Sequence, residues 1–242
     1  MRNEPAARIA IVLARPSHAG NIGAAARAMK TMGFADLRLV APRRFPHPDA
    51  QALASGAVDV LEGARVYPGL AEAIGDVSLA VGFSARSREL SHAPVALREA
   101  APRIHEAAKA GGAALVFGNE TFGLTNEELG RCQMLCSIPA NPDYSSLNLG
   151  AAVQVACYEL ALAARMPGSA KSRERTAASL EDIEALFAHW EATMVESGFH
   201  DPREPKRLME RMRRLFARTR LEREEVRFLR GMLAAYEERM KR

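Results

Sequence analysis

The stretch PSHAGNIGAAARAMK (16–30) carries two polar side chains, Asn21 and Arg27, that could contact a ligand. It follows an apolar run, IAIVLA (9–14), and leads into an alanine-rich helical pattern. Asn21 stands where a helix begins, so its side chain could simply cap the free N–H groups of the first turn. Arg27 could equally be a solvated arginine on the helix surface. The alternative is that both residues serve a binding or catalytic site.

The glycines of this stretch, Gly20 and Gly23, raise the question of a nucleotide ligand, because strand, glycine turn and helix is the layout of a dinucleotide-binding loop. That loop needs the spacing GxGxxG, whereas here the spacing is GxxG and Ala26 stands where a third glycine could be. The next predicted strand also ends in Arg43 and Arg44, where a ribose-binding acid would be needed. A classical NAD site is therefore not expected.

Two later stretches place polar residues where a strand meets a helix. VFGNETFGLTNEEL (116–129) leaves an apolar run and turns through Glu120 and two glycines, which allow a ligand to approach the backbone closely. IPANPDYSSLNLGAA (138–152) has serines and Asn148 at the predicted start of a helix, where free N–H groups can bind a small polar ligand. Each loop also has an ordinary reading as a turn or a cap.

Apolar runs alternate with helical patterns through the first two-thirds of the chain, and this alternation predicts an α/β fold with a mostly parallel sheet. In open sheets of this kind, ligands bind at the carboxyl ends of the strands. GFSARSR (82–88) is a further loop in such a position. The predicted strands are 9–14, 37–40, 77–84, 113–118 and 134–139, and the predicted helices are 21–33, 69–75, 94–110, 125–131 and a well-buried helix over 145–165.

Composition limits the class of protein. The chain has 242 residues, of which 48% are hydrophobic, and a formal net charge of +4. The three cysteines, Cys132, Cys136 and Cys157, lack the spacing of a disulfide framework or a zinc site, so we expect buried thiols and no metal. The sequence has no apolar signal core and no run of about 20 apolar residues. We expect a cytoplasmic protein without a membrane segment.

The composition changes after residue 165. Residues 166–178 are small, polar and basic, as in a linker, and 179–242 reads as an all-helical appendage with helices from 179, over 206–218 and over 222–240. Four arginines of the second helix form one stripe that few acids offset. A single-sign face of this kind can be an ordinary solvated surface, and its alternative is a site for a polyanion such as RNA. The stripe consists of Arg207, Arg211, Arg214 and Arg218.

The three loops together resemble the motifs of SPOUT-class RNA 2′-O-methyltransferases. The matches are N-x-G-x-x-x-R from Asn21 to Arg27, F-G-x-E-x-x-G-L from Phe117 to Leu124, and I-P followed by S-L-N-L up to Leu149. The resemblance spans residues 8–165. SHAGNIGAAARAMKTMG, GFSARSREL and the tail segments SGF, RRLF and LRGML are similar to the branch that methylates cytidine or uridine at tRNA position 32.

Two departures accompany the resemblance. Gly150 stands where many relatives have a serine, and Asn119 and Thr121 flank the glutamate where relatives often carry arginines. They bear on base specificity more than on the class of enzyme.

The resemblance implies a parallel sheet with a C-terminal trefoil knot in residues 1–165, a linker, and a helical extension that binds RNA or supports a dimer. It implies a homodimeric transferase that uses S-adenosylmethionine (SAM) and acts on tRNA. Catalytic or positioning roles would fall on Arg27, Asn21, Glu120, Ser146 and Asn148. The cofactor would lie against Phe83, Ser84, Ala85, Gly118, Asn119, Glu120, Gly123, Ile138, Ser145, Ser146 and Leu147, and RNA against Arg27 and the arginine stripe.

Arg27 would orient the target ribose or bind its phosphate rather than take a proton, because arginine stays protonated in proteins. Three alternatives remain at the level of the sequence. The target could be another tRNA position or ribosomal RNA, or the chain could be an RNA-binding protein that has lost the reaction.

Overall fold

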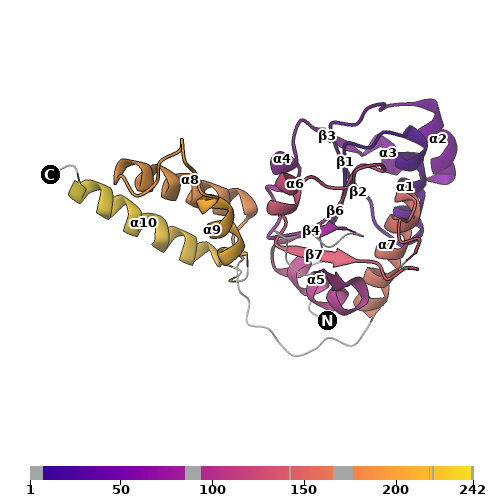
Figure 1. Ribbon diagram of the computed structural model, residues 1–242. Coiled ribbons are helices and arrows are strands. Elements are labelled where there is room, and N and C mark those ends of the chain that lie inside the picture. The colour runs from indigo at the N-terminus through magenta and orange to yellow at the C-terminus, as the bar shows by residue number, and fades with distance from the viewer. Residues whose placement is uncertain are drawn as a thin grey trace.

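Seven strands form one sheet, and every neighbouring pair is parallel (Figure 1). This computed structural model describes residues 8–84, 94–141, 143–165, 177–217, 219 and 221–240. The order across the sheet is β3-β2-β1-β6-β4-β7-β5. The strands are β1 (Ile9–Ala14), β2 (Asp36–Val40), β3 (Arg65–Tyr67), β4 (Leu79–Phe83), β5 (Val95–Ala96), β6 (Ala113–Phe117) and β7 (Met134–Ser137). The expected parallel α/β sheet is confirmed.

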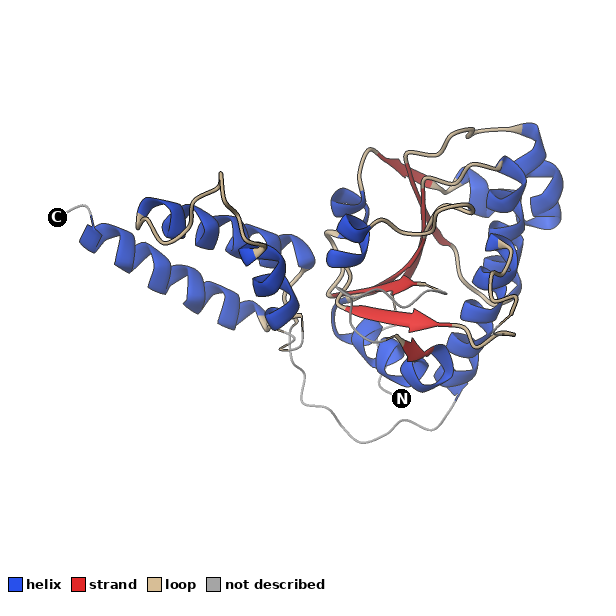
Figure 2. Ribbon diagram, in the orientation of Figure 1, coloured by secondary structure: helices blue, strands red, loops and turns tan. Residues whose placement is uncertain are grey.

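Helices cover both faces of the sheet (Figure 2). They are α1 (Ala19–Thr31), α2 (Pro48–Ala54), α3 (Val58–Glu62) after a short 3-10 turn, α4 (Leu70–Ile74), α5 (Leu97–Gly111), α6 (Asn126–Gly130), α7 (Leu149–Arg165), α8 (Leu180–Glu196), α9 (Leu208–Phe216) and α10 (Arg223–Met240). Side chains of α1, α2, α3, α5 and α7 form the core on one face, and those of α4 and α6 form the core on the other.

The central strands are apolar throughout because both of their faces are buried. In β1, Ile11 and Leu13 point into the core beneath α1 and α7, whereas Ala10 and Val12 point into the core beneath α4. The same alternation runs through β6. Such continuous apolar runs are what made these strands visible in the sequence.

The structure corrects two expectations about the helix α7, its first residue and its burial. α7 begins at Leu149 rather than at residue 145, because Asn148 caps it by accepting a hydrogen bond from Gly150 N at 2.9 Å. α7 is also less buried than expected. Ala151, Val155, Tyr158 and Leu162 form an apolar stripe on its outer side, where Tyr158 is 47% exposed and Leu162 36%.

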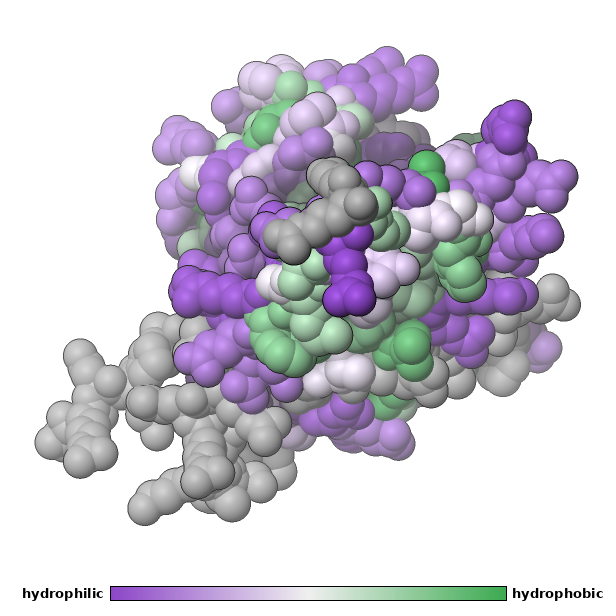
Figure 3. All heavy atoms as spheres, turned by 90° about the vertical axis from the view of Figure 1, so that its left-hand side faces the viewer, coloured by the Kyte–Doolittle hydropathy of each residue, from purple (hydrophilic) through white to green (hydrophobic). Residues whose placement is uncertain are grey.

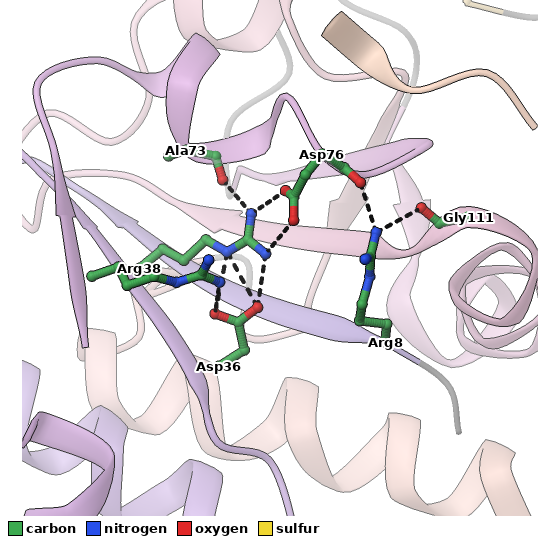
Figure 4. A network of polar contacts seen from close by, with 7 residues as sticks. Arg8, Asp36, Arg38, Ala73, Asp76 and Gly111 are labelled. Carbon is green, nitrogen blue, oxygen red and sulfur yellow. Dashed lines mark hydrogen bonds and ion pairs between the residues drawn. The ribbon is translucent and has the colours of Figure 1, made fainter. Parts of the chain in front are cut away.

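A buried arginine fastens the edge of the sheet where the strands begin (Figure 4). The Arg38 side chain is 2% exposed and forms ion pairs with Asp36 and Asp76, and its guanidinium also donates to the Ala73 carbonyl at 2.7 Å. Arg65 contacts the other oxygen of Asp36 at 2.8 Å. Burial raises the pKa of both carboxyl groups, but the arginines outweigh it and leave each pKa below its usual range.

The C-terminal helices α8, α9 and α10 have a small core of their own, which includes Leu186, Leu221 and Val226. The start of α8 joins the main domain, because Leu180 N donates to the Val77 carbonyl at 2.8 Å and Leu180 packs into the core beneath α4. Figure 3 looks onto this helical segment, where hydrophilic side chains cover much of the surface and apolar ones gather between them.

All three cysteines are free and buried, as expected, and burial raises the pKa of each thiol to about 12. These thiols are therefore core groups rather than nucleophiles. In the described part of the chain, no helix combines the length and the apolar character that crossing a bilayer requires.

Candidate functional site

Four neighbouring strands bring the predicted loops to one edge of the sheet. β1, β6, β4 and β7 lie side by side in that order and run in the same direction. The loops that follow them therefore leave from the same edge, although they are far apart in the sequence. This edge lies opposite the Arg38 network, since Asp36 stands at the first residue of β2.

Glu120 is the centre of a polar cluster at this edge. One of its carboxylate oxygens accepts from the N–H and the hydroxyl of Ser17, at 2.9 and 2.7 Å. The other accepts from His18 N at 3.2 Å and from the Asn21 amide at 3.0 Å. The loop after β6 is thereby tied to the first turn of α1. This loop pairing joins the first and second sequence motifs.

The hydrogen bonds to Glu120 also set its charge. Burial raises the pKa of this carboxyl group, but the bonds from Asn21, from Ser17 and from backbone N–H groups more than offset it and leave the pKa at about 2. Glu120 is therefore an anion near neutral pH. Its oxygens are occupied as acceptors, so this carboxylate positions the loops rather than exchanging protons.

Asn21 connects the cluster to the third motif. Its carbonyl oxygen accepts from the Asn148 amide at 2.9 Å, while its own amide donates to Glu120. The first helix starts at Ala19 after His18, so Asn21 lies inside the first turn and is not its cap. The capping role belongs to Asn148, whose side-chain oxygen binds the start of α7. A chain of hydrogen bonds thus runs from Glu120 through Asn21 to Asn148.

Two residues that the sequence analysis did not single out, Arg15 and Ser17, support this cluster. Arg15 forms a two-bond ion pair with Glu128, at 2.9 and 2.8 Å, which joins the end of β1 to α6. Glu128 also forms a capping box with Thr125 at the start of α6. Ser17 supplies two of the bonds to Glu120. A serine and an arginine directly after a buried strand were the available signals, but single residues of these types are common in turns.

The backbone after β6 folds tightly over itself. A Cβ atom on Gly118 would lie 2.2 Å from the backbone of Gly123, which leaves room for glycine alone. Gly123 has φ +69, and its N–H donates to the Asn119 carbonyl at 2.8 Å. The Asn119 side chain in turn donates to the Arg15 carbonyl at 2.8 Å. The backbone therefore favours glycine at both positions, through close contact at Gly118 and through the positive φ at Gly123.

The expected cofactor residues lie at adjacent strand ends. Phe83 ends β4 and stacks on Phe117 of β6 with ring centroids 4.4 Å apart, and Ser84 N donates to the Cys136 carbonyl of β7 at 3.1 Å. Ile138 follows β7, with Ser145, Ser146 and Leu147 just before α7. Leu147 is 40% exposed, Ser146 is exposed and Ser145 is half-buried. Ala85 lies outside the described residues.

Arg27 does not join the polar cluster. It is exposed on α1, and no described residue forms a hydrogen bond or an ion pair with its guanidinium. The helix that carries it is held closely by α2, because a Cβ atom on Gly23 would lie 2.1 Å from the Ala50 carbonyl oxygen. Arg27 is thus a free cation on a firmly packed helix.

The predicted arginine stripe is partly placed by the structure. Arg211 and Arg214 are exposed on α9, which is shorter than the expected 206–218. Arg207 precedes the helix in a left-handed conformation, with φ 57, and is also exposed. Arg218 lies outside the described residues. Arg213 has a different role, because it pairs with Glu184 at 2.6 Å and covers the Phe187 ring.

This edge thus combines a chain of polar side chains with the neighbouring ends of four strands, and the helix α1 that carries Asn21 also carries the exposed Arg27. Hydroxyl and amide groups here can hold a small polar cofactor, and free guanidinium groups suit a phosphate. The parallel sheet and the joined loops agree with the class of SPOUT methylases, whose motifs the three loops resemble. Residues 8–158 match the SpoU rRNA Methylase family, and the chain belongs to that family.

The C-terminal part of the chain indicates the branch of the family to which it belongs. Residues 181–242 match the C-terminal domain of the tRNA methyltransferase TrmJ. The tRNA (cytidine/uridine/adenosine-2′-O-)-methyltransferase TrmJ of Pseudomonas aeruginosa is 46% identical, over 93% of this chain and 92% of that protein. The tRNA (cytidine/uridine-2′-O-)-methyltransferase TrmJ of Salmonella typhimurium is 45% identical, over 96% and 98%.

A solved structure supports the same placement. The crystal structure of TrmJ from Z. mobilis superposes with a TM-score of 0.83 at 36% identity, covering 94% of this chain and 98% of that one. The likeness extends over both the sheet domain and the C-terminal helices. Within its family, this chain stands in the TrmJ branch.

Proposed function

We propose that the protein transfers a methyl group from SAM to the ribose 2′-hydroxyl of nucleotide 32 in the anticodon loop of tRNA. The observation that carries the proposal is the hydrogen-bonded chain from Glu120 through Asn21 to Asn148, which joins all three motifs of the methylase family at one edge of the sheet. The 2′-O-methyltransferase names of the relatives and the matching C-terminal domain support tRNA as the substrate.

The cofactor would lie over the ends of β4, β6 and β7. Backbone groups at Phe83, Gly118, Ile138 and Leu147 would hold its adenine and ribose, and the two serines would add hydroxyl groups. The fit rests on the neighbouring ends of β6, β4 and β7 and on the exposure of Ser146 and Leu147 in the segment that follows β7. SAM supplies an electrophilic methyl group, and the residues of the chain have to position the hydroxyl that attacks it.

Arg27 would bind the RNA near the target ribose. A guanidinium stays protonated, so it suits the orientation of a phosphate or hydroxyl better than the removal of a proton. Alignment of the attacking oxygen with the methyl group lowers the barrier by fixing the reacting geometry in advance. The bond between Glu120 and Asn21 would hold α1, and with it Arg27, in a fixed position relative to the cofactor loops.

The helical extension would hold the body of the tRNA. Arg207, Arg211 and Arg214 are exposed cations, and α9 lies near α6, the helix that follows the Glu120 loop. We divide the chain into a methylase domain (1–165), a linker (166–178) and this extension (179–242). Binding through such cations weakens steeply with salt.

We further propose a homodimer that forms through the apolar outer stripe of α7, which contains Tyr158 and Leu162. Exposed apolar stripes of this kind are typical of protein interfaces. A trefoil knot is proposed for the C-terminal part of the sheet, where β7 lies between β4 and β5 although it follows both in the chain. The tRNA substrate supports a cytoplasmic location.

The test is a methyl-transfer assay with labelled SAM and unmodified tRNA, in which wild type is compared with Arg27→Ala and Arg27→Lys. We expect transfer by wild type and a loss in kcat/KM of about 100-fold for Arg27→Ala, with SAM binding unchanged, since truncation removes only a positioning contact. Arg27→Lys should recover only part of the loss, because lysine lacks the planar fork.

Two results would contradict the proposal. If wild type binds SAM but methylates ribosomal RNA fragments and not tRNA, the substrate is wrong. If wild type neither binds SAM nor transfers a methyl group, the enzyme hypothesis itself fails and an RNA-binding protein remains.

A further inference from the structure

A pair of arginines beside the first loop has no role in the site described above. Arg43 and Arg44 follow β2, the strand next to β1, and both are exposed. Their loop is fastened to the first motif, because Arg43 N donates to the Pro16 carbonyl at 3.1 Å and Arg15 N donates to the Val40 carbonyl at 2.8 Å. The backbone of Arg43 is therefore held against Pro16, the neighbour of Ser17, which anchors Glu120.

These arginines differ from most others in the methylase domain because no described residue pairs with their guanidinium groups. Arg15, Arg38, Arg65, Arg98 and Arg131 form ion pairs with carboxylates, and Arg8 donates to backbone carbonyls. Among the described residues 8–165, the guanidinium groups without such a contact belong to Arg27, Arg43, Arg44, Arg103 and Arg165. Of these, Arg43 and Arg44 lie on the loop that touches the first motif, and Arg27 lies on the helix that continues that motif.

Within the part of the chain that the structure describes, no carboxylate forms an ion pair with Arg43 or Arg44. Glu120, the carboxylate at the centre of the first-motif cluster, accepts from Ser17, His18 and Asn21. At the start of α2, the Asp49 carboxylate oxygen Oδ2 lies 3.5 Å from Nδ1 of the His47 ring. Exposed cations that are not paired with a carboxylate attract a polyanion, and the fork of arginine fits phosphate oxygens.

We infer that Arg43 and Arg44 form a phosphate-binding site for the RNA backbone next to the target nucleotide. The inference rests on the proposed function, since it places a substrate strand across the first motif. The loop after β2 and the exposed side of α1 then act as one cationic surface. Its ligand is the phosphodiester backbone, so it contributes affinity and register rather than base specificity.

The test compares two double variants of the full-length protein that remove the same charge. Arg43→Ala with Arg44→Ala removes the proposed site. Arg103→Ala with Arg165→Ala removes two unpaired arginines from α5 and the end of α7, and Figure 1 places α5 and α2 at opposite ends of the methylase domain. Unfolding midpoints in urea establish that all variants are folded.

Binding of unmodified tRNA is measured by titration over a range of salt concentrations. For the Arg43/Arg44 variant we expect Kd to rise and the slope of log Kd against log salt to fall by about 1.5, because two phosphate contacts are lost. In methyl transfer, KM for tRNA should rise while kcat at saturating tRNA and Kd for SAM stay unchanged. Arg43→Lys with Arg44→Lys should restore most of the slope.

The outcomes separate this site from the proposed function. Equal losses in both double variants, or an unchanged slope in the Arg43/Arg44 variant, would overturn the phosphate site while wild-type methyl transfer stands. A wild type that binds tRNA but transfers no methyl group would remove the proposed function, and the salt slopes would still decide whether Arg43 and Arg44 bind the backbone.

Discussion

At the scale of single residues, the site depends on one carboxylate that holds two loops. Glu120 accepts from Ser17, His18 and Asn21, and the low pKa of its carboxyl group follows from these bonds. A residue with all of its acceptor positions occupied is poorly suited to take a proton. The chemistry of the site therefore lies in positioning.

Glu120→Gln should destabilise the protein. In wild type both carboxylate oxygens accept hydrogen bonds, whereas in the variant an NH2 group would replace one oxygen and face N–H and O–H donors. We expect the free energy of unfolding to fall by about 1–3 kcal/mol in urea titration, the cost of unsatisfied buried polar groups. Glu127→Gln is the matched control, since the Glu127 side chain is 79% exposed and forms only a surface pair with Arg131. Equal losses in both variants would contradict the anchoring role.

The stability of the protein should also respond to acid. The folded pKa of Glu120 is about 2, and the pKa values of Asp36 and Asp76 are also below their usual range. Because the folded values are depressed, the stabilisation is present above the unfolded pKa values, which are about 4, and is lost as pH falls through the folded ones.

The measurement is the free energy of unfolding between pH 7 and pH 2. Wild type should lose stability steadily below pH about 5. Glu120→Gln should lose less over that range, because it lacks one of the depressed groups. A steeper acid loss in the variant than in wild type would argue against the assignment.

At the scale of elements, the site requires α1 and α7 to lie close together. A Cβ atom on Gly150 would lie 2.7 Å from the Cβ atom of Ala24, so a side chain at this position would push the helices apart. This contact gives a physical reason for glycine where the motif of many relatives has serine. The Asn21–Asn148 bond joins the same two helices.

Gly150→Ser should therefore destabilise the protein by about 1–3 kcal/mol, as overpacking does. Adding Ala24→Gly should recover part of this loss, and a double-mutant cycle by urea unfolding measures the coupling. Gly231→Ser is the control, because no atom lies within 4 Å of a Cβ atom there. Additive effects at residues 24 and 150 would show that the two helices do not meet in this way.

How far the sequence predicted the elements depended on their burial. β1 and β6 were found because both faces of each are apolar. α2, α3 and β3 were missed, since they are short and β3 is largely exposed, so that no periodic pattern marks them. The cluster around Glu120 could be proposed only from resemblance, because hydrogen bonds between residues about 100 positions apart leave no local pattern.

At the scale of the whole molecule, the apolar outer stripe of α7 supports the proposed dimer. The sequence suggested burial for Tyr158, whereas the single chain leaves it 47% exposed. A second copy that covers the stripe would reconcile the apolar pattern with this exposure. The stripe lies on the helix that Asn148 caps, so a dimer would form close to the site.

Tyr158→Glu with Leu162→Glu should give a folded monomer, because two charges cannot be buried across the interface without partners. Ala164→Glu is the control, since Ala164 is exposed on another side of α7. Sedimentation velocity measures the mass, and circular dichroism checks the fold. A monomeric wild type, or a variant that remains dimeric, would contradict this interface.

The most direct test of the central claim uses a tRNA transcript with 2′-deoxycytidine at nucleotide 32 alone, beside the same transcript with an ordinary cytidine. Methyl transfer from labelled SAM is measured for both, together with binding. The account predicts transfer to the ordinary transcript, no transfer to the deoxy transcript, and similar binding of the two. Undiminished transfer to the deoxy transcript would show that the methyl group goes to another atom, and the assignment of the 2′-hydroxyl of nucleotide 32 would be wrong.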